Sequence, residues 1–439
     1  MHERQKYSIN PDPYWWNAAP LPEGTSQLPS QADVLIVGSG ITAMSAAITL
    51  LKNGRKVTVI DQNKIGSGAS RRNAGYVSRS FKHSFADLEK KYGLDYAIKL
   101  HRELDESVRS VQEYVDTYKL DCDLKFLGRL LPVPNSSHFK ALEDDLAKQK
   151  RYLGFEYEML DKTKLQSELA TDSYHGAALI PDLGGIHPGK YHAGLLKVAL
   201  SLGLEICEEV KALEILSSGD VKQVNTTKGV ISAKELILAT NGYTDLLFPW
   251  LRRRIIPFDA YMIATEELPE TLVKKIIPNN RVVIDTSHNP LFVRQSPDGN
   301  SILFGGLTAT KPGSFEEKGE HLAKILRRLL PDLADKQLAH SWTGKCSGTF
   351  DLYPHAGQHE GIYYSLGYCF VGVPMGTYLG KKLALNILGQ SEGKTLFFNR
   401  KFPTIPFYRE KPWFLSTVFK YYDHLDKGTP AYDFAYQSN

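Results

Sequence analysis

The chain has 439 residues, of which 42% are hydrophobic and 23% are charged, and its formal net charge at pH 7 is +4. This length exceeds one ordinary domain core and the composition is that of a globular protein, so we expect two domains. The basic residues are scattered and the four cysteines lack C-x-x-C spacing, which argues against a nucleic-acid-binding stripe, a zinc site and a disulfide framework. No stretch has a signal core or membrane-spanning length, so we expect a cytoplasmic protein without a bound metal.

Residues 1–29 form a polar arm that is rich in proline. Tyr14, Trp15 and Trp16 stand within it, and we expect these aromatic side chains to pack on the body of the protein rather than to bind a ligand.

Residues 33–61 have the pattern of a strand, a glycine turn, a helix and a second strand. An apolar run predicts a buried parallel strand, and Gly38, Gly40 and Ala43 follow it at the spacing of the G-x-G-x-x-A dinucleotide fingerprint. In this motif the first glycine permits a tight turn and the second lets backbone N–H groups approach a pyrophosphate. Asp61 ends the second strand, where a carboxylate accepts hydrogen bonds from a ribose. The motif predicts a dinucleotide site but leaves FAD and NAD open.

The next loop, residues 62–75, is rich in glycine, serine and asparagine. Its backbone and hydroxyl groups can donate hydrogen bonds to phosphates, and Arg72 adds a positive charge. Because this loop follows the second strand directly, we interpret it as part of the cofactor site rather than as a flexible connection.

The middle of the chain mixes helices with short strands. We expect helices over residues 84–118, 138–153 and 161–170, a strand pair at 122–135, and a helix that starts at or just after Pro188. Residues 235–242 predict a second buried strand that ends in a small-residue turn, and such turns face the ligand crevice of a doubly wound sheet.

The C-terminal half predicts an antiparallel sheet followed by a return to the nucleotide-type pattern. Its expected strands cover residues 255–265, 282–286, 291–295 and 301–307. Ser314 and Glu317 form a capping box, and a strand at 362–366 precedes a small-residue helix at 375–388. An amphipathic helix within 413–425 is expected to dock on the body. Nucleotide-type units interrupted twice by other segments indicate two interleaved domains.

Eight stretches of this sequence resemble the FAD-dependent amine and amino-acid oxidases of the D-amino acid oxidase and glycine oxidase superfamily. Within that superfamily the resemblance is greatest to the gamma-glutamylputrescine oxidases. The matching stretches are ADVLIVGSGITAMSAA, IGSGASRRNAGYV, LDCDLKFLGRL, GGIHPGKYHAGLLKVA, KELILATNGYT, SILFGGL, SWTGKCSGTFDLYPHAG and IYYSLGYCFVGV. They run in family order over nearly the whole chain.

The resemblance implies an α/β fold in which a Rossmann-like FAD-binding domain of the glutathione reductase type is interleaved with an α+β substrate domain built on an antiparallel sheet. The expected FAD-binding domain comprises residues 30–110, 175–242 and 340–395. The expected substrate domain comprises residues 111–174 and 243–339. The N-terminal arm and a C-terminal tail, residues 396–439, complete the chain.

The resemblance also implies which residues bind FAD. They are Gly38, Gly40, Thr42, Asp61, Gln62, Ala69, Ser70, Arg72, Asn73, Ala74, Gly75, Val210, Thr240, Asn241, Gly367, Gly372 and Val373. The fingerprint residues would hold the pyrophosphate, and the loop would hold the diphosphate and the edge of the isoalloxazine ring. The turn at residues 367–372 would bring backbone N–H groups and a helix N-terminus to the flavin pyrimidine.

The implied activity is oxidation of the C–N bond of a small amine, gamma-glutamylputrescine-like, by hydride transfer to the flavin. Water then hydrolyses the imine, and dioxygen takes the electrons to give hydrogen peroxide. An alternative is a sarcosine-like N-methyl amino-acid oxidase or dehydrogenase, and an alternative of another class is a flavin-binding protein without turnover. The implied partners are the amine and dioxygen, without nucleic acid, in a monomer or homo-oligomer.

The candidate catalytic residues on the substrate side are Cys346, Arg294, Tyr261 and Tyr76. Cys346 stands where relatives of the glycine oxidase type place a carboxylate-binding arginine, which disfavours a simple α-amino acid as substrate. The resemblance to monomeric sarcosine oxidase also leads to the hypothesis that FAD is covalently linked to Cys346. The alternative is that Cys346 is a buried inert thiol. Arg294 is interpreted either as an anchor for an acidic group farther from the reacting carbon or as a solvated or domain-bracing arginine.

Overall fold

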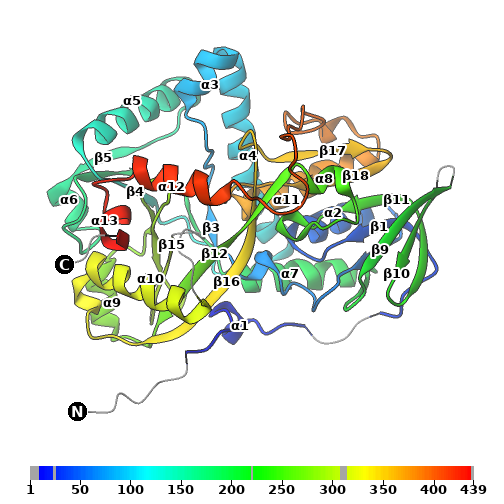
Figure 1. The fold of residues 1–439 in the computed structure, drawn as a ribbon, viewed down its shortest axis with the longest axis horizontal. Helices are drawn as coiled ribbons and strands as arrows, with labels where there is room; N and C mark the ends of the chain where they lie inside the picture. Colours follow the sequence, from blue (N-terminus) through cyan, green and yellow to red (C-terminus); the bar gives the residue numbers. More distant parts are fainter. Residues whose placement is uncertain (1–8, 23–25, 219–220, 307–313, 437–439) are drawn as a thin grey trace.

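The computed structural model describes residues 9–22, 26–218, 221–306 and 314–436. Its first sheet has parallel strands at the centre, because apolar side chains cover both of its faces. These strands are, in spatial order, β18 (Ile362–Leu366), β11 (Gly229–Leu238), β1 (Gln31–Val37), β2 (Val57–Ile60) and β8 (Glu205–Cys207). An antiparallel strand, β17 (His355–His359), borders β18, and β9 (Ala212–Ser218) and β10 (Val221–Thr226) extend from β11 (Figure 1).

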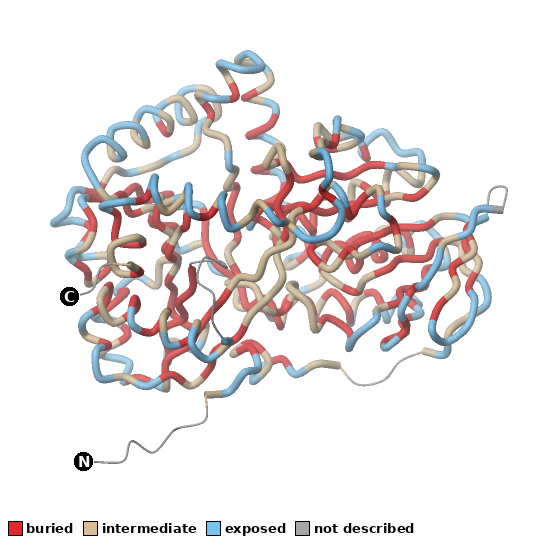
Figure 2. The backbone as a smooth tube through the Cα atoms, viewed as in Figure 1, coloured by how far each residue is buried: buried red, intermediate tan, exposed pale blue. Residues whose placement is uncertain are grey.

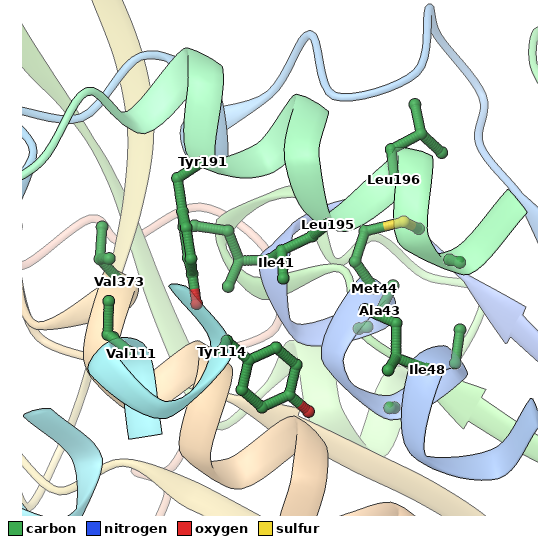
Figure 3. Close-up of a cluster of buried hydrophobic side chains, with 14 of the residues drawn as sticks. Ile41, Ala43, Met44, Ile48, Val111, Tyr114, Tyr191, Leu195, Leu196 and Val373 are labelled. Carbon is green, nitrogen blue, oxygen red and sulfur yellow. The ribbon is translucent and has the colours of Figure 1, made fainter. Parts of the chain in front are cut away.

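Helix α2 (Ile41–Lys52) packs between two helices that are distant in the sequence, α7 (Pro188–Ser201) and α11 (Gly372–Ile387). Figure 3 shows Ile41, Met44 and Ile48 beside Leu195 and other apolar side chains of this core. A methyl group on Gly380 of α11 would lie 2.5 Å from the Thr42 carbonyl oxygen, so the small residues of α11 allow close contact with α2.

The second sheet is mostly antiparallel and holds its own apolar core. Its spatial order is β16 (Leu338–Thr349), β12 (Ile255–Thr265), β15 (Ile302–Gly306), β14 (Phe292–Gln295), β13 (Val282–Ile284), β4 (Arg129–Val133), β6 (Gly176–Ile180) and β5 (Glu158–Asp161). Helices α9 (Glu270–Ile276), α10 (Phe315–Leu329) and α13 (Pro430–Tyr436) pack with this core, and α10 begins at the expected Ser314–Glu317 capping box. The two sheets confirm the predicted fold class.

The remaining elements lie around the two sheets, where Figure 2 shows more exposed residues than in the strands. They are α1 (Trp15–Ala18), α3 (Phe85–Tyr92), α4 (Leu94–Tyr118), α5 (Ser136–Leu153), α6 (Lys162–Gln166), α8 (Pro249–Arg252) and α12 (Leu415–Leu425). Strands β3 (Tyr76–Val77) and β7 (Gly184–Gly185) form a small antiparallel ribbon. Among the described residues, none of the helices combines the length and apolar character needed to cross a membrane.

Two of the expected domain limits disagree with the strand pairing. β6 and β16, which the limits 175–242 and 340–395 assign to the FAD-binding domain, belong to the second sheet. β16 pairs with β12 from Ile255↔Thr349 to Thr265↔Leu338, and local patterning does not encode this long-range pairing.

Two expected elements also differ from the structure. The helix expected over residues 84–118 is broken between α3 and α4 at Gly93, where φ is +87°, a conformation that glycine adopts readily. The strand pair expected at 122–135 is reduced to β4, because Lys125 instead makes an isolated bridge to Gly185 of β7.

Candidate cofactor and substrate site

A single cavity joins the carboxyl ends of the parallel strands to one face of β12 and β16. Asp61 and Val210 line it on the side of the first sheet. Met262, Cys346 and Phe370 line it on the side of the second sheet. The cavity therefore has the position that the fingerprint predicts for a dinucleotide, and it continues into the space between the domains.

The fingerprint turn leaves no room for a side chain at Gly38 or Gly40. Gly38 has a φ of +100°, and a methyl group there would lie 2.9 Å from the Ala239 carbonyl oxygen. A methyl group on Gly40 would lie 2.7 Å from Ser70 Oγ, which accepts a hydrogen bond from the Ile41 N–H at 3.0 Å. The backbone at the start of α2 thus forms the cavity wall directly, as the binding of a pyrophosphate requires.

Asp61 is held at the end of β2 by a residue that the sequence analysis did not select. Its carboxylate accepts hydrogen bonds from the Ser39 N–H at 2.9 Å, from Ser39 Oγ at 2.6 Å and from the Asn63 N–H at 2.9 Å. Burial raises the pKa of the Asp61 carboxyl, and the hydrogen bonds from Ser39 oppose that shift. Ser39 therefore fixes the carboxylate in the cavity wall.

The two arginines of the loop at residues 62–75 have different roles. The Arg71 side chain is fully buried and donates hydrogen bonds to the carbonyls of Ala19 and Pro20 in the N-terminal arm. Arg72 lines the cavity, donates from Nε to the Ser67 carbonyl at 2.6 Å, and lies over the ring of Trp16 at 4.7 Å. The aromatic residues of the arm thus pack on the body as expected, and they also brace the cofactor loop.

Asn241 ties the second small-residue turn to both neighbouring segments. Its side-chain oxygen accepts hydrogen bonds from Ser347 Oγ at 2.5 Å and from the Gly367 N–H at 2.9 Å. Gly367 itself lies outside the cavity wall, whereas Gly372 and Val373 at the N-terminus of α11 line it. The helix N-terminus therefore faces the cavity as expected, whereas Gly367 stabilises the turn through its hydrogen bond to Asn241.

Arg294 does not reach the cavity, which corrects its expected role as a substrate anchor. The guanidinium is buried, and its Nη1 donates to the carbonyls of Ala74 at 3.0 Å, Gly75 at 3.1 Å and Ile186 at 2.9 Å. Gly75 lies beneath it, with a φ of +71°, and is likewise absent from the cavity wall. Both residues hold the end of the cofactor loop against β7 and α7, which is the bracing alternative for Arg294.

The two candidate tyrosines also have other roles than expected. Tyr261 faces away from the cavity, where Lys318 Nζ donates to its hydroxyl at 2.9 Å, because alternate residues of β12 point to opposite faces and Ala260 and Met262 take the cavity side. The Tyr76 ring lines the cavity, but its hydroxyl donates to the Val283 carbonyl at 2.8 Å. Burial raises the pKa of the Tyr76 hydroxyl above its ordinary value, and Tyr261 lies outside the cavity wall, so neither hydroxyl is placed for acid–base catalysis.

Cys346 lies on the face of β16 that lines the cavity, as expected. It pairs with Phe258 across β12, and burial raises the pKa of its thiol to about 12. A second thiol, that of Cys369, also lines the cavity, and burial raises its pKa to about 11. Both thiols therefore stay protonated at neutral pH.

The remaining predicted cofactor residues line the cavity, and further residues join them. The predicted group is Thr42, Gln62, Ala69, Ser70, Asn73, Ala74, Val210 and Thr240. Sequence reasoning missed Tyr243, Met262, Ile284, Phe292 and Tyr368. Strand alternation is the only signal that pointed to Met262, and Tyr368 was visible only as part of the 367–372 turn, where its hydroxyl contacts Thr42 Oγ1 at 2.6 Å.

Comparison with known proteins decides which cofactor this cavity serves. The profile of the FAD dependent oxidoreductase family matches residues 33–385. The chain belongs to this family. Gamma-glutamylputrescine oxidoreductase from Escherichia coli is 31% identical over 377 residues, which cover 85% of this chain and 87% of that protein. A probable oxidoreductase, OrdL, from Haemophilus influenzae is 29% identical over 379 residues, with the same coverage of 85% and 87%.

The fold of this FAD-dependent oxidoreductase agrees with a solved relative. The crystal structure of glycine oxidase from Geobacillus kaustophilus superposes with a TM-score of 0.70 at 20% sequence identity, covering 86% of this chain and 99% of that one. The close backbone approach at Gly38 and Gly40, the fixed Asp61 carboxylate and the Arg72 charge fit an FAD molecule with its diphosphate at the start of α2. The cofactor of the enzyme is FAD.

Proposed function

We propose that the enzyme oxidises the C–N bond of a small amine or amino compound, of the gamma-glutamylputrescine type, with dioxygen as electron acceptor. The observation that carries this proposal is the apolar character of the cavity at β12 and β16. Met262, Ile284, Phe292, Cys346 and Phe370 line that part. The Arg72 guanidinium borders it but is committed to backbone carbonyls, donating from Nη1 to the Thr343 carbonyl of β16 at 3.1 Å.

An apolar site favours the neutral form of an amine over its ammonium form, because burial disfavours charge. The neutral amine has the lone pair that pushes electron density toward the C–H bond as the hydride leaves. FAD, when bound, supplies the acceptor for that hydride. The substrate carbon loses a hydride and the nitrogen loses a proton, so the product is an imine, which water converts to a carbonyl compound and a free amine.

The side chains of this chain orient the substrate and exclude water rather than transfer protons. The thiols of Cys346 and Cys369 have raised pKa values, and the Tyr76 hydroxyl is committed to a backbone carbonyl. Arg294 lies outside the cavity, and the Arg72 guanidinium already donates to the carbonyls of Ser67 and Thr343, which supports the expectation that simple α-amino acids are poor substrates.

Anaerobic titration of the FAD-loaded enzyme tests this function. Polyamines, their gamma-glutamyl adducts and N-methyl amino acids are added in turn while the visible flavin absorbance is followed. We expect the gamma-glutamyl adducts to bleach the flavin and air to restore it with one peroxide per amine oxidised. Bleaching by N-methyl amino acids alone would favour the sarcosine-like alternative, and bleaching by none of the amines would overturn the proposal in favour of a flavin-binding protein without turnover.

We predict that acid denaturation of the holoenzyme releases all of its flavin into the supernatant. The reason is that burial keeps the Cys346 thiol protonated, and a protonated thiol is a poor nucleophile for attachment to the cofactor. The measurement is the flavin absorbance of supernatant and pellet after precipitation. A pellet that stays yellow in the wild type and turns colourless in Cys346→Ser would instead establish the covalent link.

A further inference from the structure

We propose that Lys82 and Phe370 form a binding subsite for a carboxylate group of the amine substrate. This inference rests on the proposed function and narrows it to amines that carry an acidic group several carbon atoms from the reacting nitrogen. Lys82 lies in the loop between β3 and α3, and its Nζ stands 5.0 Å from the centre of the Phe370 ring. Phe370 lines the cavity and is 44% exposed, so this pair stands at the cavity rim.

The backbone of the turn at residues 367–372 is strained, and this conformation places Phe370 at the cavity rim. Cys369 and Phe370 are consecutive non-glycine residues with φ values of +48° and +78°. Such a conformation costs about 1 kcal/mol or more for each residue and persists where surrounding structure holds it. Here the Cys369 N–H donates to the Ser347 carbonyl at 3.2 Å, and the Phe370 ring packs on Phe258 at 5.2 Å.

Lys82 has no acidic partner of its own. Among the described residues it takes part in no ion pair, and Lys82 is exposed to solvent. The charge of Asp426 acts on it, but the Asp426 carboxylate already accepts hydrogen bonds from the N–H groups of His288 and Asn289, each at 2.9 Å. A cation held over an aromatic ring without a carboxylate partner has the chemistry to pair with an anionic ligand group.

Aromatic side chains form the path between this cation and the cavity. Phe258 lies on β12 opposite Cys346, and its ring packs on that of Phe370. The centroids of the Phe258 and Phe419 rings, the latter on α12, are 6.4 Å apart. Figure 1 shows α12 crossing the face of the molecule near β12. These rings suit an aliphatic segment, with the amine reacting inside the cavity and the carboxylate remaining at Lys82. The acidic anchor that was expected at Arg294 is thereby assigned to a different residue.

Substrate pairs that differ in the carboxylate test the subsite. Gamma-glutamylputrescine carries it, whereas N-acetylputrescine lacks it together with the α-amino group and the longer chain of the glutamyl group; the response of each substrate to substitution of Lys82 is therefore compared. For Lys82→Met we expect the KM for gamma-glutamylputrescine to rise about tenfold to a hundredfold, with little change in kcat, because one charged hydrogen bond is lost. The KM for N-acetylputrescine should stay the same. Lys82→Arg should retain most of the affinity and Lys82→Glu should lose more than Lys82→Met.

Lys91→Met is the matched control, because Lys91 lies over the ring of Tyr92 at 5.1 Å on α3, away from the cavity wall. A second measurement does not need turnover: glutarate, which has no amine to oxidise, is titrated into the oxidised holoenzyme and the perturbation of the flavin band is followed. We expect glutarate to bind the wild type and Lys91→Met, and to bind Lys82→Met at least tenfold more weakly. Equal binding to all three proteins, or no binding to the wild type, would overturn the subsite. The amine titration above reports separately on the proposed function.

Discussion

Gly75→Ala is expected to yield a protein that unfolds more easily and does not retain FAD. A methyl group on Gly75 would lie 2.2 Å from the Ile186 carbonyl oxygen and 2.7 Å from Arg294 Nη1, and the φ of +71° is itself unfavourable for alanine. The backbone strain alone is about 1–2 kcal/mol, and relief of the clash must shift the end of the cofactor loop, so we expect a total loss of about 3 kcal/mol or more. Urea unfolding of the apoprotein and flavin retained through gel filtration measure the two effects.

Gly54→Ala separates the clash from the backbone strain. Gly54 has a φ of +76°, close to that of Gly75, but a methyl group there would meet no atom within 4 Å. We expect this control to lose about 1 kcal/mol and to keep its FAD. If both variants were destabilised equally and both retained the cofactor, the tight packing of Gly75 beneath Arg294 would be disproved.

Arg294→Met should destabilise the fold by about 3 kcal/mol or more and weaken FAD binding, while leaving the substrate KM of the reloaded enzyme unchanged. The substitution removes the Arg294 donor from the carbonyls of Ala74 and Ile186, whereas the Gly75 carbonyl keeps its hydrogen bond from the Ile186 N–H at 2.8 Å. Each carbonyl left unpaired costs about 1–3 kcal/mol. Arg294→Lys should recover only part of the stability, because an ammonium group lacks the planar fork of the guanidinium. The free energy of unfolding in urea and the FAD dissociation constant are the measurements.

Arg109→Met is the matched control for a surface arginine. Its side chain is 77% exposed and pairs with Asp105, and such pairs contribute about 1 kcal/mol or less. A substrate-anchoring role for Arg294 makes the opposite prediction to ours: a raised KM in a protein of normal stability. That outcome would restore the anchor interpretation and contradict the buried network.

The cofactor side of the site could be predicted because its geometry is local. The turn at Gly38 and Gly40, the strand ends and the carboxylate at Asp61 lie within one β–α–β unit, so their spacing in sequence determines their spacing in space. The expected strand over residues 255–265 also matches β12 at both ends.

The substrate side could not be predicted in the same way. Alternation shows that Tyr261 and Met262 point to opposite faces of β12, but it does not say which face meets the cofactor; the packing of α10 against Tyr261 decides that. Arg294 offers a comparable case, because a lone arginine on a strand has the same sequence signature whether it reaches a substrate or the carbonyls of a neighbouring loop.

The sequence by itself therefore determined the fold class, the dinucleotide fingerprint and the family, because each depends on short-range order or on the spacing of motifs along this chain. Only the tertiary structure decided the membership of β16 in the second sheet, the burial of Arg294 and the position of Lys82 at the cavity rim. These features arise from contacts between residues that are far apart in the sequence, at least 73 positions in the β12–β16 pairing (338 − 265), and local spacing does not determine such contacts.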